Sequence, residues 1–313
     1  MPGGALFSAP MVGELSDDLE APSEDRAFIN FWFRHVWELT WPLYPAILIA
    51  STVLDDAPLD KLILSTSPMS VAAIAIGFLL CFRRVSLPAR VSSQRVGLGT
   101  WRELLAAVWP VLLVVLLTIA LAVAKHAGMP LALSTKAALL AVLALVVPAF
   151  MAIKRIGWAA ARTLLRATLR LRLIVLVYGI MAFGHMLKAY HAADHLPGDF
   201  QALGVPTRVL LFVVPFLVGL LMGYSPAYVA ICFPVLKPLL MVDGGVHYGH
   251  YVWAISAGFV GVLVSPVHLC LLLTKDYFKA DLGRVYRRLV PAAALLALAA
   301  LAASLLWQAV GLR

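Results

Sequence analysis

The most apolar part of the sequence is interrupted by small, polar and helix-breaking residues, and this interruption has the chemistry of a binding site. Residues 206–240 form two apolar arms joined by Gly223, Tyr224, Ser225 and Pro226. Lipid satisfies no backbone N–H or C=O group, so such a break is tolerated only where protein covers it or where it lines a cavity. The free N–H groups of a half-helix suit an anion, whereas serine hydroxyls and unwound carbonyls suit a small cation.

The same chemistry occurs at three other places in the chain. Glycine, serine and proline form a second tip near the N-terminus, proline breaks a later segment at residues 41–45, and Ser265 and Pro266 break another. One such break is often only a kink in a transmembrane helix, but four in repeated order favour a shared site. The breaks supply the candidate substrate-binding residues Gly3, Gly4, Ser8, Pro10, Pro42, Tyr44, Gly223, Ser225, Pro226, Ser265, Pro266 and His268.

Glu38 and His268 are the candidates for holding a coupling cation or carrying a proton. Glu38 follows Arg34 by four residues, a spacing that fits an ion pair on one helical face. An acid inside an apolar segment is costly, which also makes Glu38 a candidate for proton or cation coupling. His268 could neutralise an anion or carry a proton, and it could equally be hydrogen-bonded within a helix bundle.

The other polar clusters predict neither catalysis nor a metal site. His191, Asp194 and His195 have the spacing of metal ligands on a helix, but no further ligand converges on them in the sequence. The motifs of an intramembrane hydrolase do not occur, and His268 with Ser265 is a weak pair, so we expect no enzyme activity and no cofactor. The three cysteines lie inside apolar segments and are expected to be core residues: Cys81, Cys232 and Cys270.

Composition places these residues in a membrane protein. Of 313 residues, 62% are hydrophobic and 13% are charged, and the mean hydropathy is +0.93. One soluble core could not bury so much apolar surface, so we predict an all-α polytopic protein of the cytoplasmic (inner) membrane. The net charge of +9 comes from basic residues in short loops between apolar segments. This is the positive-inside pattern, and it does not indicate nucleic acid as a partner.

The apolar segments alternate with basic stretches along the chain. The segments expected to enter or cross the bilayer are a broken one at residues 31–53, then 62–82, 104–124, 130–153, 173–188, a re-entrant hairpin at 206–240, a broken one at 250–275, and 291–310. The basic stretches are residues 83–102, 154–172 and 275–288, which we place in the cytoplasm. Residues 154–172 carry arginine along one helical face, which predicts an amphipathic helix on the inner leaflet.

A hairpin tip followed by a broken segment occurs twice, at residues 3–45 and 223–268. The basic stretches imply that the two tips enter from opposite sides, which is typical of an inverted-repeat secondary transporter. The first tip has no entering arm to match residues 206–222, so an N-terminal part of the fold is expected to be missing. The predicted divisions are 1–103 for the end of the first repeat, 104–205 for further spans with the amphipathic helix, and 206–313 for the second hairpin, broken helix and last span.

Several long strings resemble the integral membrane family called domain of unknown function 401: GGALFSAPMV, FINFWFRHVWELTWPLYP, GYSPAYVAICFPVL and SPVHLCLLLTKDYF. That family is placed in the ion transporter superfamily with gluconate permeases, dicarboxylate carriers and sodium-coupled citrate carriers. The resemblance covers nearly the whole chain and implies transport without naming a substrate. Better-known relatives carry Ser-Asn-Thr at both tips for sodium and carboxylate. Here the only asparagine is Asn30, so the resemblance does not extend to that sodium motif.

These expectations describe a secondary active transporter that moves a small anion, by resemblance an organic carboxylate, across the cytoplasmic membrane. A sodium ion and a proton both remain open as the coupling ion. The alternatives are an anion channel and a structural membrane subunit that transports nothing; saturable uptake driven by an ion gradient distinguishes the carrier from both. The expected partners are the lipid bilayer, the small anion and a second copy of the chain in a homodimer.

Overall fold

The computed structural model describes residues 2–17, 21–82, 135–153, 155–160 and 204–310, with scattered positions between 109 and 190. The predicted segments at 104–124 and 173–188, most of the amphipathic stretch 154–172, and the trio His191, Asp194 and His195 lie outside these residues. The chain divides into two compact units, each described by itself. The first contains residues 1–57, 61–91 and 180–313, and the second contains residues 58–60 and 92–179.

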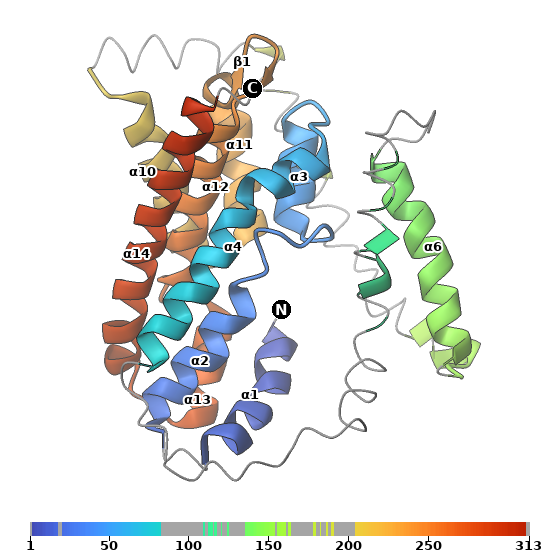
Figure 1. Ribbon diagram of the computed structural model, residues 1–313, viewed down its shortest axis with the longest axis vertical. Coiled ribbons are helices and arrows are strands. Elements are labelled where there is room, and N and C mark those ends of the chain that lie inside the picture. Colours follow the sequence, from blue (N-terminus) through green and yellow to red (C-terminus); the bar gives the residue numbers. More distant parts are fainter. Residues whose placement is uncertain are drawn as a thin grey trace. The chain divides into compact units, whose positions relative to one another are not determined.

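The described chain is mostly helical, as predicted (Figure 1). The helices of the first unit are α1 (Pro2–Asp17), α2 (Ser23–His35), α3 (Pro45–Val53), α4 (Leu59–Phe82), α10 (Thr207–Met222), α11 (Ser225–Leu240), α12 (Tyr248–Leu263), α13 (Leu269–Phe278) and α14 (Leu282–Ala309). Between α11 and α12, a two-stranded antiparallel hairpin pairs β1 (Met241–Val242) with β2 (Gly245–Val246). In the second unit, α6 (Thr135–Ile153) falls within the predicted segment at 130–153 and contains Pro148.

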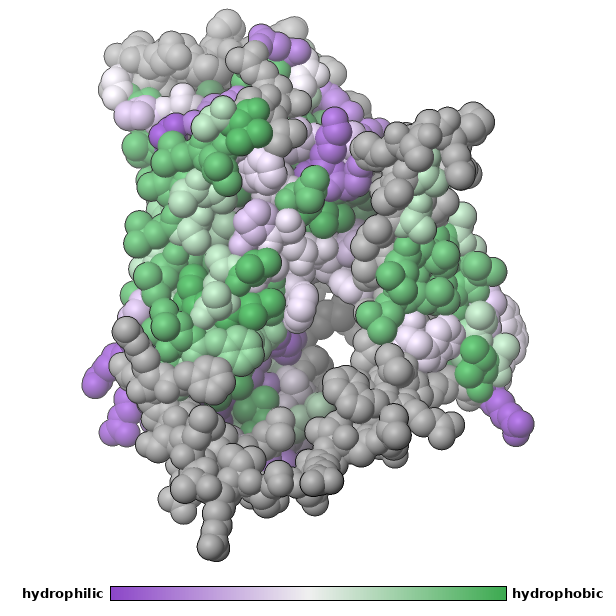
Figure 2. Space-filling view, viewed as in Figure 1, coloured by the Kyte–Doolittle hydropathy of each residue, from purple (hydrophilic) through white to green (hydrophobic). Residues whose placement is uncertain are grey.

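Among the described residues, two helices are long and apolar enough to cross a membrane. They are Leu59–Cys81 of α4 and Leu282–Ala309, with mean hydropathies of 1.9 and 2.4. Large apolar side chains such as Leu64 and Leu298 are exposed on them, and the space-filling view is mostly green over α14 and α4 (Figure 2). Apolar side chains turned outward along a helix suit lipid rather than water, so these helices point to membrane association.

The helix α14 begins nine residues before the predicted start at residue 291, so part of the predicted basic loop at 275–288 is helical instead. The side chain of Asp281 caps the helix by accepting a hydrogen bond from the backbone N–H of Arg284 at 2.8 Å. Arg288 forms an ion pair with Asp25 of α2. A capping acid at the N-terminus and this pairing allow the basic residues to be part of the helix.

The N-terminal tip was wrongly predicted as a helix break. Residues Gly3 to Pro10 lie inside the continuous helix α1, which packs against α2 and α13. Ala5 and Ala9 are fully buried on this helix, so its small residues allow close packing. Proline within a helix removes a backbone hydrogen bond and clashes with the preceding turn, and packing of this kind offsets that cost.

Breaks at the other three places are confirmed. The helix α2 ends at His35 and α3 begins at Pro45, so residues 36–44 separate them. A two-residue link separates α10 from α11, and residues 264–268 separate α12 from α13. In the link, Gly223 adopts the left-handed conformation with φ 59°, which glycine takes without the steric cost that other residues meet.

Side-chain contacts place the starts of α10 and α2 near opposite ends of α14. At its C-terminal end, Gln308 accepts a hydrogen bond from Arg208, near the start of α10. At its N-terminal end, Arg288 pairs with Asp25, near the start of α2. The helices α10, α12 and α14 run alongside one another between these ends (Figure 1).

Candidate functional site

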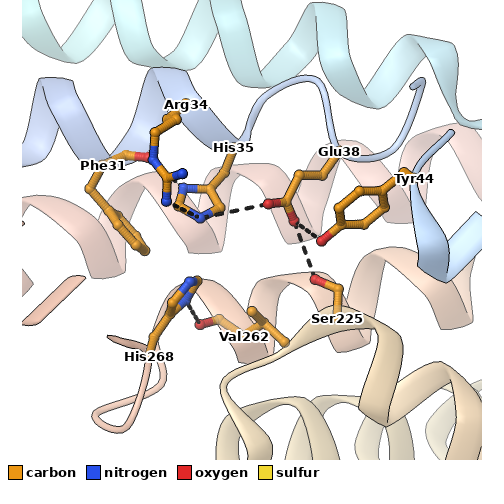
Figure 3. A network of polar contacts seen from close by, with 8 residues as sticks. All are labelled: Phe31, Arg34, His35, Glu38, Tyr44, Ser225, Val262 and His268. Carbon is orange, nitrogen blue, oxygen red and sulfur yellow. Dashed lines mark hydrogen bonds and ion pairs between the residues drawn. The ribbon is translucent and has the colours of Figure 1, made fainter. Parts of the chain in front are cut away.

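Glu38 stands where the break after α2 meets the break before α11 (Figure 3). One carboxylate oxygen, Oε2, accepts hydrogen bonds from the hydroxyl of Tyr44 and from Ser225 Oγ at 3.3 Å. The other, Oε1, lies 3.7 Å from Nε2 of His35. The Glu38 side chain is only 16% exposed, so these donors replace most of the water that a carboxylate requires.

The tip of the α10–α11 pair is pressed against the break between α12 and α13. A Cβ atom added to Gly223 would lie 2.9 Å from Ser265 Oγ and 3.0 Å from the backbone nitrogen of His268. Ser265 is fully buried, and its hydroxyl donates to the carbonyl of Leu220 at 2.6 Å. The second and third breaks are therefore joined by direct contact, with no room for a larger residue at the tip.

Two histidines from different breaks lie face to edge. The rings of His35 and His268 have centroids 4.9 Å apart and an interplanar angle of 81°. His35 Nδ1 lies 2.6 Å from the carbonyl oxygen of Phe31, and His268 Nδ1 lies 2.9 Å from that of Val262. A carbonyl oxygen only accepts hydrogen bonds, so each Nδ1 carries the proton and donates it. In the neutral ring, each Nε2 is then the unprotonated nitrogen.

A second polar cluster lies between α1, α2 and α13. The side-chain oxygen of Asn30 accepts from Ser8 Oγ at 2.6 Å. The amide nitrogen of Asn30 donates to Thr274 Oγ1 at 3.1 Å and to the carbonyl of Ala5 at 3.2 Å. Asn30 and Thr274 are buried, so this network ties α1 to its neighbours with its polar groups satisfied.

A family model described as "Protein of unknown function (DUF401)" matches residues 1–307. The chain belongs to the DUF401 family. The resemblance drawn from the sequence strings is thus confirmed at family level, whereas the link to the ion transporter superfamily stays a prediction. No curated protein matches the sequence.

The structure of this DUF401 chain brings together part of the predicted site. Glu38, Tyr44, Gly223, Ser225, Ser265 and His268 lie at or beside the meeting point of the three breaks. Pro226 is buried in the first turn of α11, Pro42 lies in the break after α2, and Pro266 is exposed in the break before α13. Ser8 belongs instead to the Asn30 network, and Pro10 is exposed on α1. Gly3 and Gly4 lie in α1.

The predicted helical pairing of Arg34 with Glu38 is wrong in its geometry. Spacing of four residues places two side chains on one face only while the helix continues, and α2 ends at His35. Glu38 therefore lies in the turn beyond the helix and faces Tyr44 and Ser225.

The sequence reasoning missed His35 and gave Cys270 only a core role. His35 is 2% exposed and lies in the centre of the DUF401 site. One ring nitrogen of His35, one ring nitrogen of His268 and the sulfur of Cys270 lie within 4.8 Å of one another. The available signal was a histidine between Arg34 and Glu38 in an apolar segment.

The arrangement offers three kinds of chemistry. The carboxylate of Glu38 accepts hydrogen bonds from hydroxyl groups, and the guanidinium of Arg34 lies 3.4 Å from His35 Nε2. The helices α11 and α13 begin at Ser225 and Leu269 beside the centre, and the first N–H groups of a helix have no partner within it. The centre therefore combines one buried acid with several positive groups or dipole ends.

Proposed function

We propose that this DUF401 protein is a secondary active transporter for a small anion of the carboxylate class. Its substrate site lies where the breaks at residues 36–44, 223–224 and 264–268 meet. The proposal treats the paired helices α10 and α11 as a re-entrant hairpin, and treats α2–α3 and α12–α13 as discontinuous membrane helices.

The observation that carries the proposal is that the three interruptions contact one another, and the helix lengths support a position at mid-depth. The helix α14 has 28 residues, about 42 Å at a rise of about 1.5 Å per residue. From one end, α10 contributes 16 residues, about 24 Å, before it reaches Gly223. From the other end, α2 contributes 13 residues, about 20 Å, before its break. The two lengths add up to the length of α14, which supports a meeting point near the middle of the bilayer.

Unwound backbone at mid-depth is typical of transporter substrate sites. Discontinuous helices expose N–H groups and carbonyls there, and the bilayer tolerates this only beside a cavity or under protein cover. The buried centre at Glu38 and Ser225 fits that description.

The charges at the centre support an anion as the substrate. The N-termini of α11 and α13 each contribute about half a positive charge, and Arg34 adds a guanidinium near His35. Glu38 is already bonded by the hydroxyls of Tyr44 and Ser225, which spread its negative charge. A planar carboxylate can accept several N–H groups at once, as helix N-termini require.

Reconstitution of the purified chain into proteoliposomes tests the proposal. Small organic carboxylates and inorganic anions are first screened for thermal stabilisation, with and without sodium ions. We expect at least one stabilising anion to be taken up saturably, at a rate that an inward sodium or proton gradient increases. Flux that does not saturate and ignores both gradients would instead indicate a channel. Binding without flux would indicate a subunit that transports nothing.

A further inference from the structure

Two histidines and a cysteine meet in the buried centre of the first unit, although they come from α2 and from the start of α13. We propose that His35, His268 and Cys270 form a binding site for a transition-metal ion of the zinc class. All three residues are buried, and their ligand atoms lie within 4.8 Å of one another. The inference concerns metal binding alone and does not depend on transport.

The distances are close to those that a bound ion imposes. Zinc binds histidine nitrogen at about 2.0–2.1 Å and cysteine sulfur at about 2.3 Å, which in a tetrahedral site sets ligand atoms about 3.4–3.6 Å apart. The separations in the cluster reach at most 4.8 Å, so the longest exceeds this spacing by at most about 1.2–1.4 Å. Small side-chain rotations about χ1 and χ2 close such a gap, without movement of the helices.

The hydrogen bonds of both histidines have the pattern of metal ligands. A histidine that binds a metal through one nitrogen usually donates its other ring N–H to a carbonyl or carboxylate, which fixes the tautomer and the orientation of the ring. His35 and His268 each donate from Nδ1 to a backbone carbonyl, at 2.6 and 2.9 Å. Each Nε2 therefore carries a lone pair, as a ligand to a metal must. At His35 an N–H of Arg34 faces this lone pair at 3.4 Å and has to give way to the ion.

The donor set selects the kind of ion. Imidazole nitrogen and thiolate sulfur suit zinc and copper, whereas magnesium and calcium prefer oxygen. Three protein ligands leave one position of a tetrahedral ion open. A further donor is Glu38, whose Oε1 lies 3.7 Å from His35 Nε2, so a carboxylate is available to complete the site or to hold a bound water.

Arg34 opposes the ion and supplies a sharp test. Its Nη2 lies 3.4 Å from His35 Nε2, so a cation bound there meets a positive neighbour within a few ångströms. Removal of that charge should strengthen metal binding, whereas a purely structural histidine pair gives no reason for any change. We expect Arg34→Gln to bind the ion several times more tightly than wild type.

The experiment uses full-length protein purified through a tag without histidine and stripped of metal by a chelator. Cobalt(II) is titrated as a coloured substitute for zinc, because thiolate ligation produces an intense charge-transfer absorption. We expect one cobalt per chain, a thiolate band, and displacement by zinc. His35→Asn, His268→Asn and Cys270→Ser should each weaken binding by about a hundredfold or more, since loss of a mere supporting partner costs about 10–100-fold.

The variants are chosen to keep the fold. Asparagine retains an N–H near the position of Nδ1, so it can still bond to the carbonyl of Phe31 or Val262, but it removes the Nε2 ligand. Cys232→Ser is the matched control, because Cys232 is a buried cysteine placed elsewhere, with its sulfur 4.0 Å from the carbonyl of Val214. Cobalt binding without a thiolate band, equal binding by Cys270→Ser and wild type, or no binding at all would overturn the proposal.

Discussion

At the scale of single residues, the centre depends on Glu38 and on the hydroxyls that face it. The carboxylate is mostly buried and receives Tyr44 and Ser225 from two different breaks. A buried acid holds a fold together only while its hydrogen-bond partners remain, because a charged group without them keeps its full desolvation cost.

Tyr44→Phe should therefore lower the stability of the protein. The change removes the hydroxyl that donates to Glu38 and keeps the ring. Loss of a hydrogen bond to a charged group costs about 1.5–3 kcal/mol, and denaturant unfolding in detergent measures it. Tyr277→Phe is the control, because Tyr277 is 45% exposed and should change the free energy of unfolding by less than about 0.5 kcal/mol. A loss of the same size in both variants would show that Glu38 does not depend on Tyr44.

The sequence predicted some of these residues and missed others for physical reasons. Glycine, serine and proline mark breaks because they change the local backbone, so Gly223, Ser225 and Ser265 were predictable. His35 and Cys270 form a cluster only when α2 and α13 pack together in the folded chain, so the sequence did not reveal it. The expectation that Arg34 and Glu38 share one helical face failed because it required α2 to continue past His35.

At the scale of elements, α12 packs against α10 and α11 through glycines at very short range. A Cβ atom on Gly219 would lie 2.2 Å from the carbonyl oxygen of Gly258, and one on Gly258 would lie 2.2 Å from the ring of Tyr228. Small residues allow such close backbone approach between helices, as is typical of membrane proteins. This packing fixes the hairpin tip against the break between α12 and α13.

Gly258→Ala should destabilise this packing. The added methyl group has no space, and forcing extra volume into a packed interior costs about 1–3 kcal/mol. Gly13→Ala is the matched control, since a Cβ there would first meet a side-chain atom at 3.9 Å and alanine favours a helix by about 1 kcal/mol. Thermal unfolding of both variants in detergent provides the measurement. A higher melting temperature for Gly258→Ala would contradict the close approach.

The N-terminal tip and the tip at residue 223 show why elements are only partly predictable. Both contain glycine, serine and proline, yet residues 3–10 are helical and residue 223 is not. In α1, buried alanines pack on α2 and α13, and this tertiary contact outweighs a weak local preference. At the second tip, proline follows glycine at the start of α11, and both residues suit the end of one helix and the beginning of another.

At the scale of the whole molecule, the proposed topology places opposite ends of α14 on opposite sides of the membrane. Arg284 lies at the basic end, which the positive-inside rule assigns to the cytoplasm. Asp243 lies in the turn between β1 and β2, which follows the returning arm of the proposed hairpin.

Cysteine labelling in intact cells tests this topology. In a background with all three native cysteines changed to serine, Asp243→Cys should react with an impermeant thiol reagent, and Arg284→Cys should react only after the cells are opened. Both original side chains are exposed, so labelling at each position depends on which side of the membrane it faces and not on burial. Labelling of position 284 from outside would show that the proposed orientation is wrong. Equal labelling of both positions would show that α14 does not cross the membrane.

Uptake by one matched pair of variants tests whether the substrate binds where the three breaks meet. Ser225→Ala removes the hydroxyl that links the hairpin to Glu38. Ser67→Ala removes a hydroxyl that bonds to Leu64 within α4. Uptake is measured in proteoliposomes with the anion that wild type transports. We expect Ser225→Ala to raise KM about tenfold, because a tenfold change corresponds to about 1.4 kcal/mol, the free energy that one such hydrogen bond supplies. Ser67→Ala should transport like wild type. If Ser225→Ala and Ser67→Ala both match the wild-type KM and maximal rate, the meeting point of the breaks is not the substrate site.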